Sequence, residues 1–317
     1  MLTACEFEKP KYPIHARPTI EATISSDGKL VATLARSGHE DPLLRIKWLD
    51  KDEPWQALPA PMFTTSIRFG LKGYGLLLSH ALPDNLALGQ LTRWDLADLS
   101  KESEAIAQLP ELAFPVEVKP GEYLVRTCDA YIDPPDSCRR KGGTSWLLVK
   151  ANQEPVKLTP NYQSITFSQP NVTDKGFFWV DRIPVPPNSQ LPKLLAYPLP
   201  GGEAPRFDVA RIPMKDKGYA DTHVDCDRSM QRCIHLDMAG EQRELGNRFL
   251  FKPEVIYGQE VCKVEGVSGY VDDRSMTPDG RAAVMAVAPQ YDQARHIVVV
   301  RFAPGQCAPI SIEHLNF

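Results

Sequence analysis

The stretch Ile24-Ser25-Ser26-Asp27-Gly28-Lys29-Leu30-Val31-Ala32 reads as the end of one strand, an Asp-Gly turn and a second, apolar strand. An altered copy, Met276-Thr277-Pro278-Asp279-Gly280-Arg281-Ala282-Ala283-Val284, stands near the other end of the chain. Asp-Gly between two apolar strands is typical of a β-hairpin, because glycine adopts the positive φ that a tight turn requires. If further copies lie between these two, the chain is a repeat protein.

The intervening sequence contains such copies. First hairpin turns at residues 28, 73, 121, 176, 229 and 280 are separated by steps of 45, 48, 55, 53 and 51 residues. In the first unit, Ile20–Leu34 supplies two strands, Leu43–Leu49 a third and Pro54–Leu58 a short fourth. Four antiparallel strands in about 40–45 residues is the length of a propeller blade. The pattern therefore predicts an all-β, six-bladed β-propeller of four-stranded antiparallel blades.

The repeat is degenerate, which leaves alternatives open. Only two of the six units carry a clean Asp-Gly, and no Gly-His…Trp-Asp pair recurs, so seven blades and a pair of β-sandwiches are alternatives. The Asp-Gly turns, with Trp94-Asp95-Leu96 at the end of a third strand, resemble the TolB-type and WD40-like β-propeller families over most of the chain. The resemblance implies action through protein partners in envelope complexes. Ring closure by the segment near Ile14 or by Ile310-Ser311-Ile312 is an open question.

The N-terminus carries a second motif, since Leu2-Thr3-Ala4-Cys5 resembles a bacterial lipobox whose cysteine is lipidated. No charged segment or apolar run of about 7–15 residues precedes it, as a signal peptide would require. A clipped signal peptide or a misplaced start codon would explain why the lipobox-like motif stands without these segments. The alternative is a chance tetrapeptide in a cytoplasmic protein. We expect residues 1–18 to form a tether and residues 19–317 a single propeller domain.

Cysteine usage favours a lipidated, exported chain over a chance tetrapeptide in a cytoplasmic protein. Removing Cys5 from the seven cysteines leaves an even number, as an oxidising compartment produces. These six are Cys128, Cys138, Cys226, Cys233, Cys262 and Cys307. Cys226 can face Cys233 across a hairpin, and Cys128 and Cys138 bracket a proline-containing loop. Cys262 and Cys307 then pair by elimination. This pairing is a hypothesis, because six cysteines allow 15 connectivities. Zinc fails on spacing, because no C-x2-C occurs, and reduced, inert cysteines are the alternative.

Bulk properties narrow the function classes. The 317 residues carry a net charge of −4, with lysine and arginine scattered, so nothing indicates a nucleic-acid surface. No apolar run approaches the roughly 18–20 residues that span a bilayer, and a membrane is expected only through the lipid anchor. We expect a monomer without a cofactor.

Catalytic motifs are weak. Gly266-Val267-Ser268-Gly269 lacks the second spacing of the hydrolase elbow G-x-S-x-G. Asp221, His223 and Asp225 alternate along one strand, so they can share a face and bind a divalent metal or supply a base near the axis. The favoured interpretation is a polar strand face that lines the channel or solvent.

Binding candidates are stronger. The connections between second and third strands should gather on one face of the propeller, and loops held by a rigid scaffold often carry functional residues. These connections are 36–42, 80–89, 128–144, 181–193 and 288–296. The partner-binding candidates in these loops are Tyr131, Ile132, Asp133, Ile183, Val185 and Tyr291. Apolar side chains there can anchor a protein interface or fold back onto the blade rims.

The sequence thus favours a non-catalytic, lipid-anchored β-propeller of the bacterial periplasm, held at the outer membrane, that binds a protein partner of the envelope. One alternative is an immunity-type lipoprotein that neutralises a periplasmic toxin. The other is a lactonase-like propeller hydrolase with a metal at the central channel.

Overall fold

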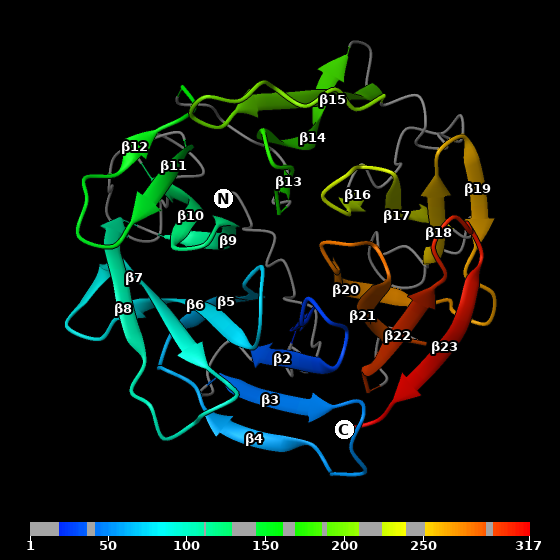
Figure 1. The fold of residues 1–317 in the computed structure, drawn as a ribbon, viewed down its shortest axis with the longest axis horizontal. Helices are drawn as coiled ribbons and strands as arrows, with labels where there is room; N and C mark the ends of the chain where they lie inside the picture. The colour runs from blue at the N-terminus through cyan, green and yellow to red at the C-terminus, as the bar shows by residue number, and fades with distance from the viewer. Residues whose placement is uncertain are drawn as a thin grey trace, which may run out of the picture.

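The chain forms six β-sheets arranged around a central axis (Figure 1). The computed structural model describes residues 19–36, 42–110, 112–128, 144–160, 169–185, 189–208, 224–238, 251–289 and 294–317. These residues form strands joined by turns and contain no helix, so none of them provides a helix that could cross a membrane.

The blades follow one another along the sequence. Blade 1 contains β1 (Thr19–Ile24), β2 (Leu30–Arg36), β3 (Leu43–Trp48) and β4 (Gln56–Pro59). Blade 2 contains β5 (Thr64–Phe69), β6 (Gly75–Leu82), β7 (Asn85–Asp95) and β8 (Glu104–Pro110). Blade 3 contains β9 (Ala113–Lys119), β10 (Glu122–Cys128), β11 (Thr144–Lys150) and β12 (Val156–Lys157). Blade 4 contains β13 (Asn171–Val172), β14 (Gly176–Val185) and β15 (Ser189–Pro198). Blade 5 contains β16 (Val224–Cys226), β17 (Arg232–Met238), β18 (Phe251–Tyr257) and β19 (Glu260–Lys263). Blade 6 contains β20 (Tyr270–Met276), β21 (Ala282–Ala288), β22 (His296–Phe302) and β23 (Pro309–Leu315).

Consecutive strands pair antiparallel within each blade, with the first strand at the axis. Five sheets have four strands, and the described part of blade 4 supplies three. The predicted six-bladed propeller is therefore confirmed, and seven blades and paired sandwiches are excluded. The segment Leu96–Leu109, whose composition also suits a helix, ends in strand β8.

The two Asp-Gly motifs fold in the same way, which explains their sequence. Gly28 and Gly280 take φ of 70° and 69°. The Asp27 carboxylate accepts hydrogen bonds from Ser25 Oγ at 2.6 Å and from the Lys29 amide at 3.1 Å. At the other copy, Asp279 accepts from Thr277 Oγ1 at 2.7 Å and from the Arg281 amide at 3.0 Å. The motif is thus a hydroxyl residue, an aspartate and a glycine that together satisfy the turn's backbone donors.

The hydrophobic core is a ring of clusters between neighbouring blades. Leu34 and Leu44 of blade 1 pack with Ile67 and Leu78 of blade 2 in one such cluster. All seven residues of β21 are buried, because both faces of this strand meet another blade. Each blade therefore buries side chains on both faces, and alternation of apolar and polar residues is weak in the inner strands.

Ring closure occurs without a shared sheet in the part of the chain that is described. Ile310-Ser311-Ile312 lies in β23, which pairs with β22 of its own blade. Blade 6 instead meets blade 1 through side chains: Asp272 Oδ2 accepts a hydrogen bond from the Ile20 amide at 3.1 Å, and Asp273 Oδ2 accepts one from the Ala22 amide at 3.0 Å. At the rim, Trp55 Nε1 donates to the Asn316 carbonyl at 2.8 Å. We call this junction the seam.

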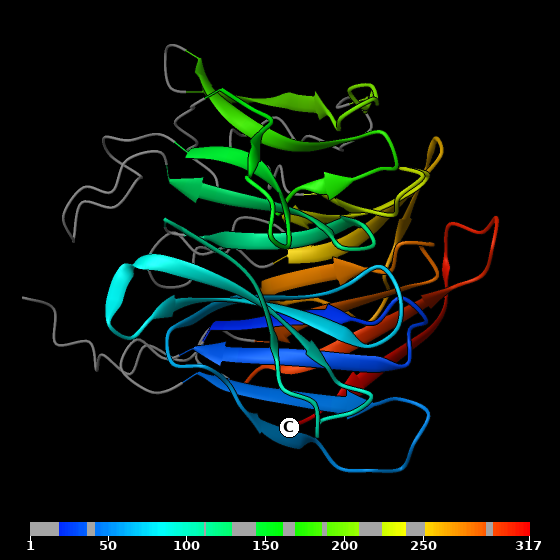
Figure 2. The ribbon, with the colours of Figure 1, turned by 60° about the vertical axis from the view of Figure 1, so that its left-hand side comes forward.

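The two ends of the ring differ. We call the loop face the face at which first strands begin and second strands end, as the pairing of Thr19 with Arg36 shows for blade 1; the opposite one is the turn face. The second-to-third-strand connections leave from the loop face, as predicted. Two of them are shorter than predicted, because pairing continues to Leu82–Asn85 in blade 2 and to Val185–Ser189 in blade 4. The predicted loops 80–89 and 181–193 are thus mostly strand, and the β6–β7 hairpin projects beyond the ring (Figure 2).

Candidate functional site

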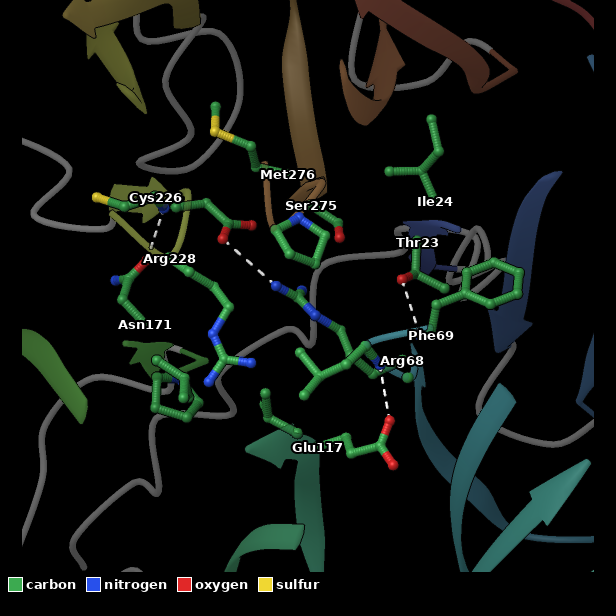
Figure 3. A pocket seen from close by; sticks show the side chains of 17 residues that line it. Thr23, Ile24, Arg68, Phe69, Glu117, Asn171, Cys226, Arg228, Ser275 and Met276 are labelled. Atoms are coloured by element: carbon green, nitrogen blue, oxygen red, sulfur yellow. Dashed lines mark hydrogen bonds and ion pairs between the residues drawn. The ribbon is translucent and has the colours of Figure 1, made fainter. Parts of the chain in front are cut away.

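The first strands of the blades line a cavity on the axis, toward the turn face (Figure 3). Its polar lining residues are Thr23 of β1, Arg68 of β5, Glu117 of β9, Asn171 of β13, Asp225 of β16, Arg228 of the β16–β17 turn and Ser275 of β20. The cavity measures about 60 Å³, enough for a few water molecules. Pockets that enclose a small organic ligand are usually several times larger, at about 300–1,000 Å³.

Arg68 crosses the axis from blade 2 to blade 5. Its Nη2 lies 3.3 Å from Asp225 Oδ1, and both side chains are 12% exposed (Figure 3). Its Nη1 donates a hydrogen bond to Gln169 Oε1. Burial raises the pKa of Asp225, and the charges of Arg68 and Arg274 oppose that rise. The arginine therefore stabilises the ionised form of a carboxyl group that burial alone would protonate.

Two further carboxyl groups, the buried Glu21 and the half-buried Asp273, belong to first strands of the ring. Burial raises the pKa of Glu21 to about 8, against the opposing charge of Arg36, whose Nη2 lies 2.7 Å from Glu21 Oε1. Burial also raises the pKa of Asp273 to about 6, although hydrogen bonds from the backbone oppose it. These groups come from blades 1 and 6, on the two sides of the seam.

Most axial side chains bond the backbone of a neighbouring blade. Glu21 Oε2 accepts from the Ile67 amide at 3.0 Å, and Glu117 Oε2 accepts from the Leu71 amide at 2.7 Å. Asn171 accepts from the Cys226 amide at 2.6 Å and donates to the Val224 carbonyl at 2.9 Å. First strands at the axis have no sheet partner on their inner edge, so these side chains satisfy backbone groups that would otherwise be unpaired.

Arg228 lines the cavity and joins four blades (Figure 3). Its Nη2 donates to the Val118 carbonyl of blade 3 at 2.7 Å and to the Thr173 carbonyl beside blade 4 at 3.2 Å. Its backbone amide donates to the Pro278 carbonyl of blade 6 at 3.0 Å. The arginine thus makes hydrogen bonds that hold the ring together.

Several sequence-predicted residues take their expected places. Asp225 faces the axis, where it pairs with Arg68. The disulfides Cys226–Cys233 and Cys262–Cys307 are both present, as predicted. Ile183 and Val185, predicted to lie in a loop, instead lie at the loop-face end of strand β14, opposite Leu191 and Ser189 of β15.

Other predicted residues lie outside the described residues. They are Cys5, Tyr131, Ile132, Asp133, Cys138, Asp221, His223 and Tyr291. The pairing of Cys128 with Cys138 and the grouping of Asp221 and His223 with Asp225 therefore stay predictions. Within the described ranges, one group of metal-ligand residues converges, Glu260 with Cys262 and Cys307, and its two sulfurs are joined in a disulfide.

Sequence reasoning missed Glu21, Arg68, Asp273 and Arg228. A signal was available, because Glu21 stands between Ile20 and Ala22 and Arg68 between Ile67 and Phe69, where a charge needs a partner. Glu21 pairs with Arg36 of its own blade and Arg68 with Asp225 across the ring, and neither pairing has a sequence signature.

No protein-family model and no curated protein matches this sequence. Solved structures share the fold. A putative TolB from Agrobacterium tumefaciens superposes with a TM-score of 0.54 at 10% identity, over 83% of this chain and 87% of that one. A puromycin hydrolase mutant gives 0.54 at 12% identity, over 95% of this chain and 54% of that one, so this chain spans about half of the hydrolase. The β-propeller domain of the Trilobed protease from Pyrococcus furiosus gives a TM-score of 0.50 at 12% identity, over 93% of this chain and 85% of that one.

These comparisons place the chain in the class of β-propellers. The similar structures include a TolB protein and parts of hydrolytic enzymes, so the fold is common to proteins that differ in activity.

Proposed function

We propose that this chain is a non-catalytic, protein-binding β-propeller of the bacterial envelope, exported to the periplasm and held at the outer membrane by a lipid on Cys5. The observation that carries the proposal is the engagement of the axial polar groups. Glu21, Glu117 and Asn171 each bond the backbone of a neighbouring blade, and Asp225 pairs with Arg68. A general base or a nucleophile must be able to reach a substrate, whereas these groups hold the ring together around a cavity of water size.

The disulfides support the compartment. Cys226–Cys233 and Cys262–Cys307 fit an oxidising environment such as the periplasm, since the cytosol keeps thiols reduced. The lipobox-like Leu2-Thr3-Ala4-Cys5 supports attachment to a membrane. The shared fold of the Agrobacterium TolB makes a binding role compatible with this architecture.

The loop face is the binding surface that we favour. The second and third strands of each blade turn there, and the β14–β15 hairpin carries Ile183 and Val185 at that end. Peptide segments supported by a rigid sheet are well placed to present apolar anchors to a protein partner.

A capture experiment tests the proposal. The intact chain is used as bait in detergent extracts of envelopes, beside an Ile183→Ser/Val185→Ser variant. We expect the variant to retain at most about one tenth of the partner, because loss of anchor residues costs more than about 1.4 kcal/mol of binding.

The matched control is Val261→Ser, which removes an exposed apolar side chain, 47% accessible, from the outer strand β19. It should capture as much partner as the unmodified chain. Equal capture by all three proteins would contradict the proposed surface. Capture of a toxin would instead support the immunity alternative, and turnover of a lactone by the purified chain would support the hydrolase alternative.

A further inference from the structure

The connection between blades 1 and 2 contains a turn with an unusual residue. Thr64 donates hydrogen bonds to the Pro61 carbonyl from its amide at 3.2 Å and from Oγ1 at 2.6 Å, which closes the turn Pro61-Met62-Phe63-Thr64. Phe63 stands at its third position with φ of 59°. Glycine or asparagine normally occupies such a position, because a side chain is unfavourable there. Backbone strain of this kind is concentrated where a side chain serves a function.

The side chains of this turn face outward. Met62 is 50% exposed and Phe63 is 44% exposed. A second phenylalanine with positive φ, Phe114 at 52°, stands at the start of β9. Its position has an internal explanation, because its ring contacts the blade 3–4 core and the Arg126 guanidinium at 4.4 Å, and its amide donates to Ser66 Oγ at 3.2 Å. Among the residues that the structure describes, Phe63 has no such contact that would explain its exposed position.

The turn lies on the loop face, beside the point where the N-terminal segment joins the ring. Thr19, the first residue of β1, pairs with Arg36, and Arg36 Nη1 donates a hydrogen bond to the Thr65 carbonyl. Leu86, 56% exposed, adds a third apolar side chain at the loop-face end of the β6–β7 hairpin in blade 2. We call Met62, Phe63 and Leu86 the apolar rim.

The length of chain before Thr19 indicates what covers the apolar rim. Thr19 follows Cys5 by 14 positions, and a chain of that length reaches at most about 50 Å when fully extended. A lipid on Cys5, which belongs to the proposed function, would therefore hold the loop face close to the bilayer. The rim would then meet lipid at high effective concentration.

We propose that the apolar rim inserts into the membrane surface to which the chain is anchored. Exposed Met and Phe side chains on a turn suit the boundary between headgroups and acyl chains. The rim orients the propeller, since one lipid anchor by itself fixes no rotation. Blades 1 and 2 then face the bilayer, and the strand ends of blades 3 to 6 are left to a partner.

Vesicles test this contact directly. The full chain is coupled through the Cys5 thiol to a maleimide lipid in phosphatidylethanolamine–phosphatidylglycerol vesicles that contain brominated acyl chains. Tryptophan fluorescence is compared between the unmodified chain and a Phe63→Trp variant. We expect the signal added at position 63 to be quenched about twofold or more, because bromine quenches indoles that enter the acyl boundary. The control Ile310→Trp replaces a side chain that is 61% exposed at the turn-face end of the outer strand β23 and should show no added quenching.

A second variant removes the contact without threatening the fold. Phe63→Gly suits the positive φ, so it should fold at least as well as the unmodified chain. Vesicle coupling should slow amide hydrogen exchange at residues 62–65 several-fold in the unmodified chain and leave the exchange of Phe63→Gly unchanged.

Equal quenching at positions 63 and 310, or none at either, would overturn the proposal. If Phe63→Gly instead reduced capture of an envelope protein and vesicles had no effect, the rim would be a protein interface. The maleimide supplies the tether in every case, so these outcomes are independent of whether Cys5 is lipidated in cells. That modification is tested by mass spectrometry of the chain isolated from envelopes.

Discussion

At the scale of single residues, buried carboxyl groups at the axis are bonded from more than one direction. Glu21 accepts hydrogen bonds from the Arg36 guanidinium in its own blade and from the Ile67 amide in the next. Such a group stabilises the ring through its acceptors and destabilises it through the cost of burying a charge. Which effect dominates depends on pH.

Glu21 should make the ring less stable as pH rises. Its pKa of about 8 in the folded chain lies above the usual 4.5, so the folded state binds the proton more tightly than the unfolded state between these values. The unfolding free energy therefore falls from about pH 5 to about pH 8. Glu21→Gln keeps an acceptor for Ile67 and does not titrate. We expect the unfolding free energy of Glu21→Gln to rise by about 4 kcal/mol relative to that of the unmodified chain between pH 5 and pH 8, since each pH unit in this range is worth about 1.4 kcal/mol.

Urea unfolding at pH 5 and pH 8 measures this difference. Asp273, whose pKa is about 6, is present in both proteins, and its charge raises the pKa of Glu21, so the difference reports the titration of Glu21 together with its interaction with Asp273. Asp98→Asn, at an exposed turn, is the control and should show the pH dependence of the unmodified chain. A parallel loss of stability in Glu21→Gln and in the unmodified chain would contradict this account.

The residue scale also marks the limit of sequence reasoning. The alternation in β16 indicated that Asp225 faces the axis, and it does. Its partner Arg68 stands 157 positions earlier, in a blade across the ring. Periodicity gives the face on which a residue lies, whereas a contact across the axis depends on how far each inner strand tilts and on side-chain length. The sequence pattern contains neither quantity.

At the scale of elements, turns were the most predictable feature. Gly28, Gly73, Gly121 and Gly280 all take positive φ at predicted first turns, because few other residues can do so. Strand ends at the loop face were less predictable. The predicted loops 80–89 and 181–193 contain Pro83, Pro184 and Pro192, yet the β6–β7 and β14–β15 ladders extend past or up to these residues. A proline is compatible with a strand when its missing donor faces away from the ladder.

The two disulfides close chain segments of different length and should therefore contribute differently to the free energy of unfolding. Cys262–Cys307 links β19 of blade 5 to the turn before β23 of blade 6, across 45 positions, and Cys226–Cys233 spans 7 positions within one hairpin. Loop-closure entropy predicts about 4 kcal/mol for the first and about 2 kcal/mol for the second. We expect Cys262→Ala/Cys307→Ala to lose more unfolding free energy than Cys226→Ala/Cys233→Ala in urea titrations. The reverse order would show that local packing outweighs chain entropy here.

At the scale of the whole molecule, the ring is closed by side chains rather than by a shared sheet, as far as the described residues show. Neighbouring blades elsewhere are consecutive in sequence, so a connecting segment limits how far they can separate. Blades 6 and 1 lie at opposite ends of the described chain. The seam therefore depends on the Asp272 and Asp273 hydrogen bonds, the packing of Ile20 and Ala22 against β21, and the contact of Phe317 with Trp55 at a ring separation of 5.0 Å.

Opening of the seam should be the first global motion of this propeller, and Asp272→Ala should promote it. The change removes the acceptor of the Ile20 amide and leaves Arg295, 5% exposed at its side chain, without the carboxylate 2.9 Å from its Nε. Removing one member of a buried ion pair costs up to about 3–5 kcal/mol. Hydrogen exchange should therefore accelerate by at least tenfold in β1 and β20 and change little in β9–β11 of blade 3. Glu117→Ala is the matched control, because it removes an equivalent acceptor, that of the Leu71 amide, between blades 2 and 3. The segment between β8 and β9 joins blades 2 and 3 covalently. Hydrogen exchange in the strands at this interface should therefore accelerate less in Glu117→Ala than exchange in β1 and β20 does in Asp272→Ala. Equal acceleration in the two variants would mean that connection in sequence adds nothing to the stability of a blade interface, and that the seam is no weaker than the other junctions of the ring.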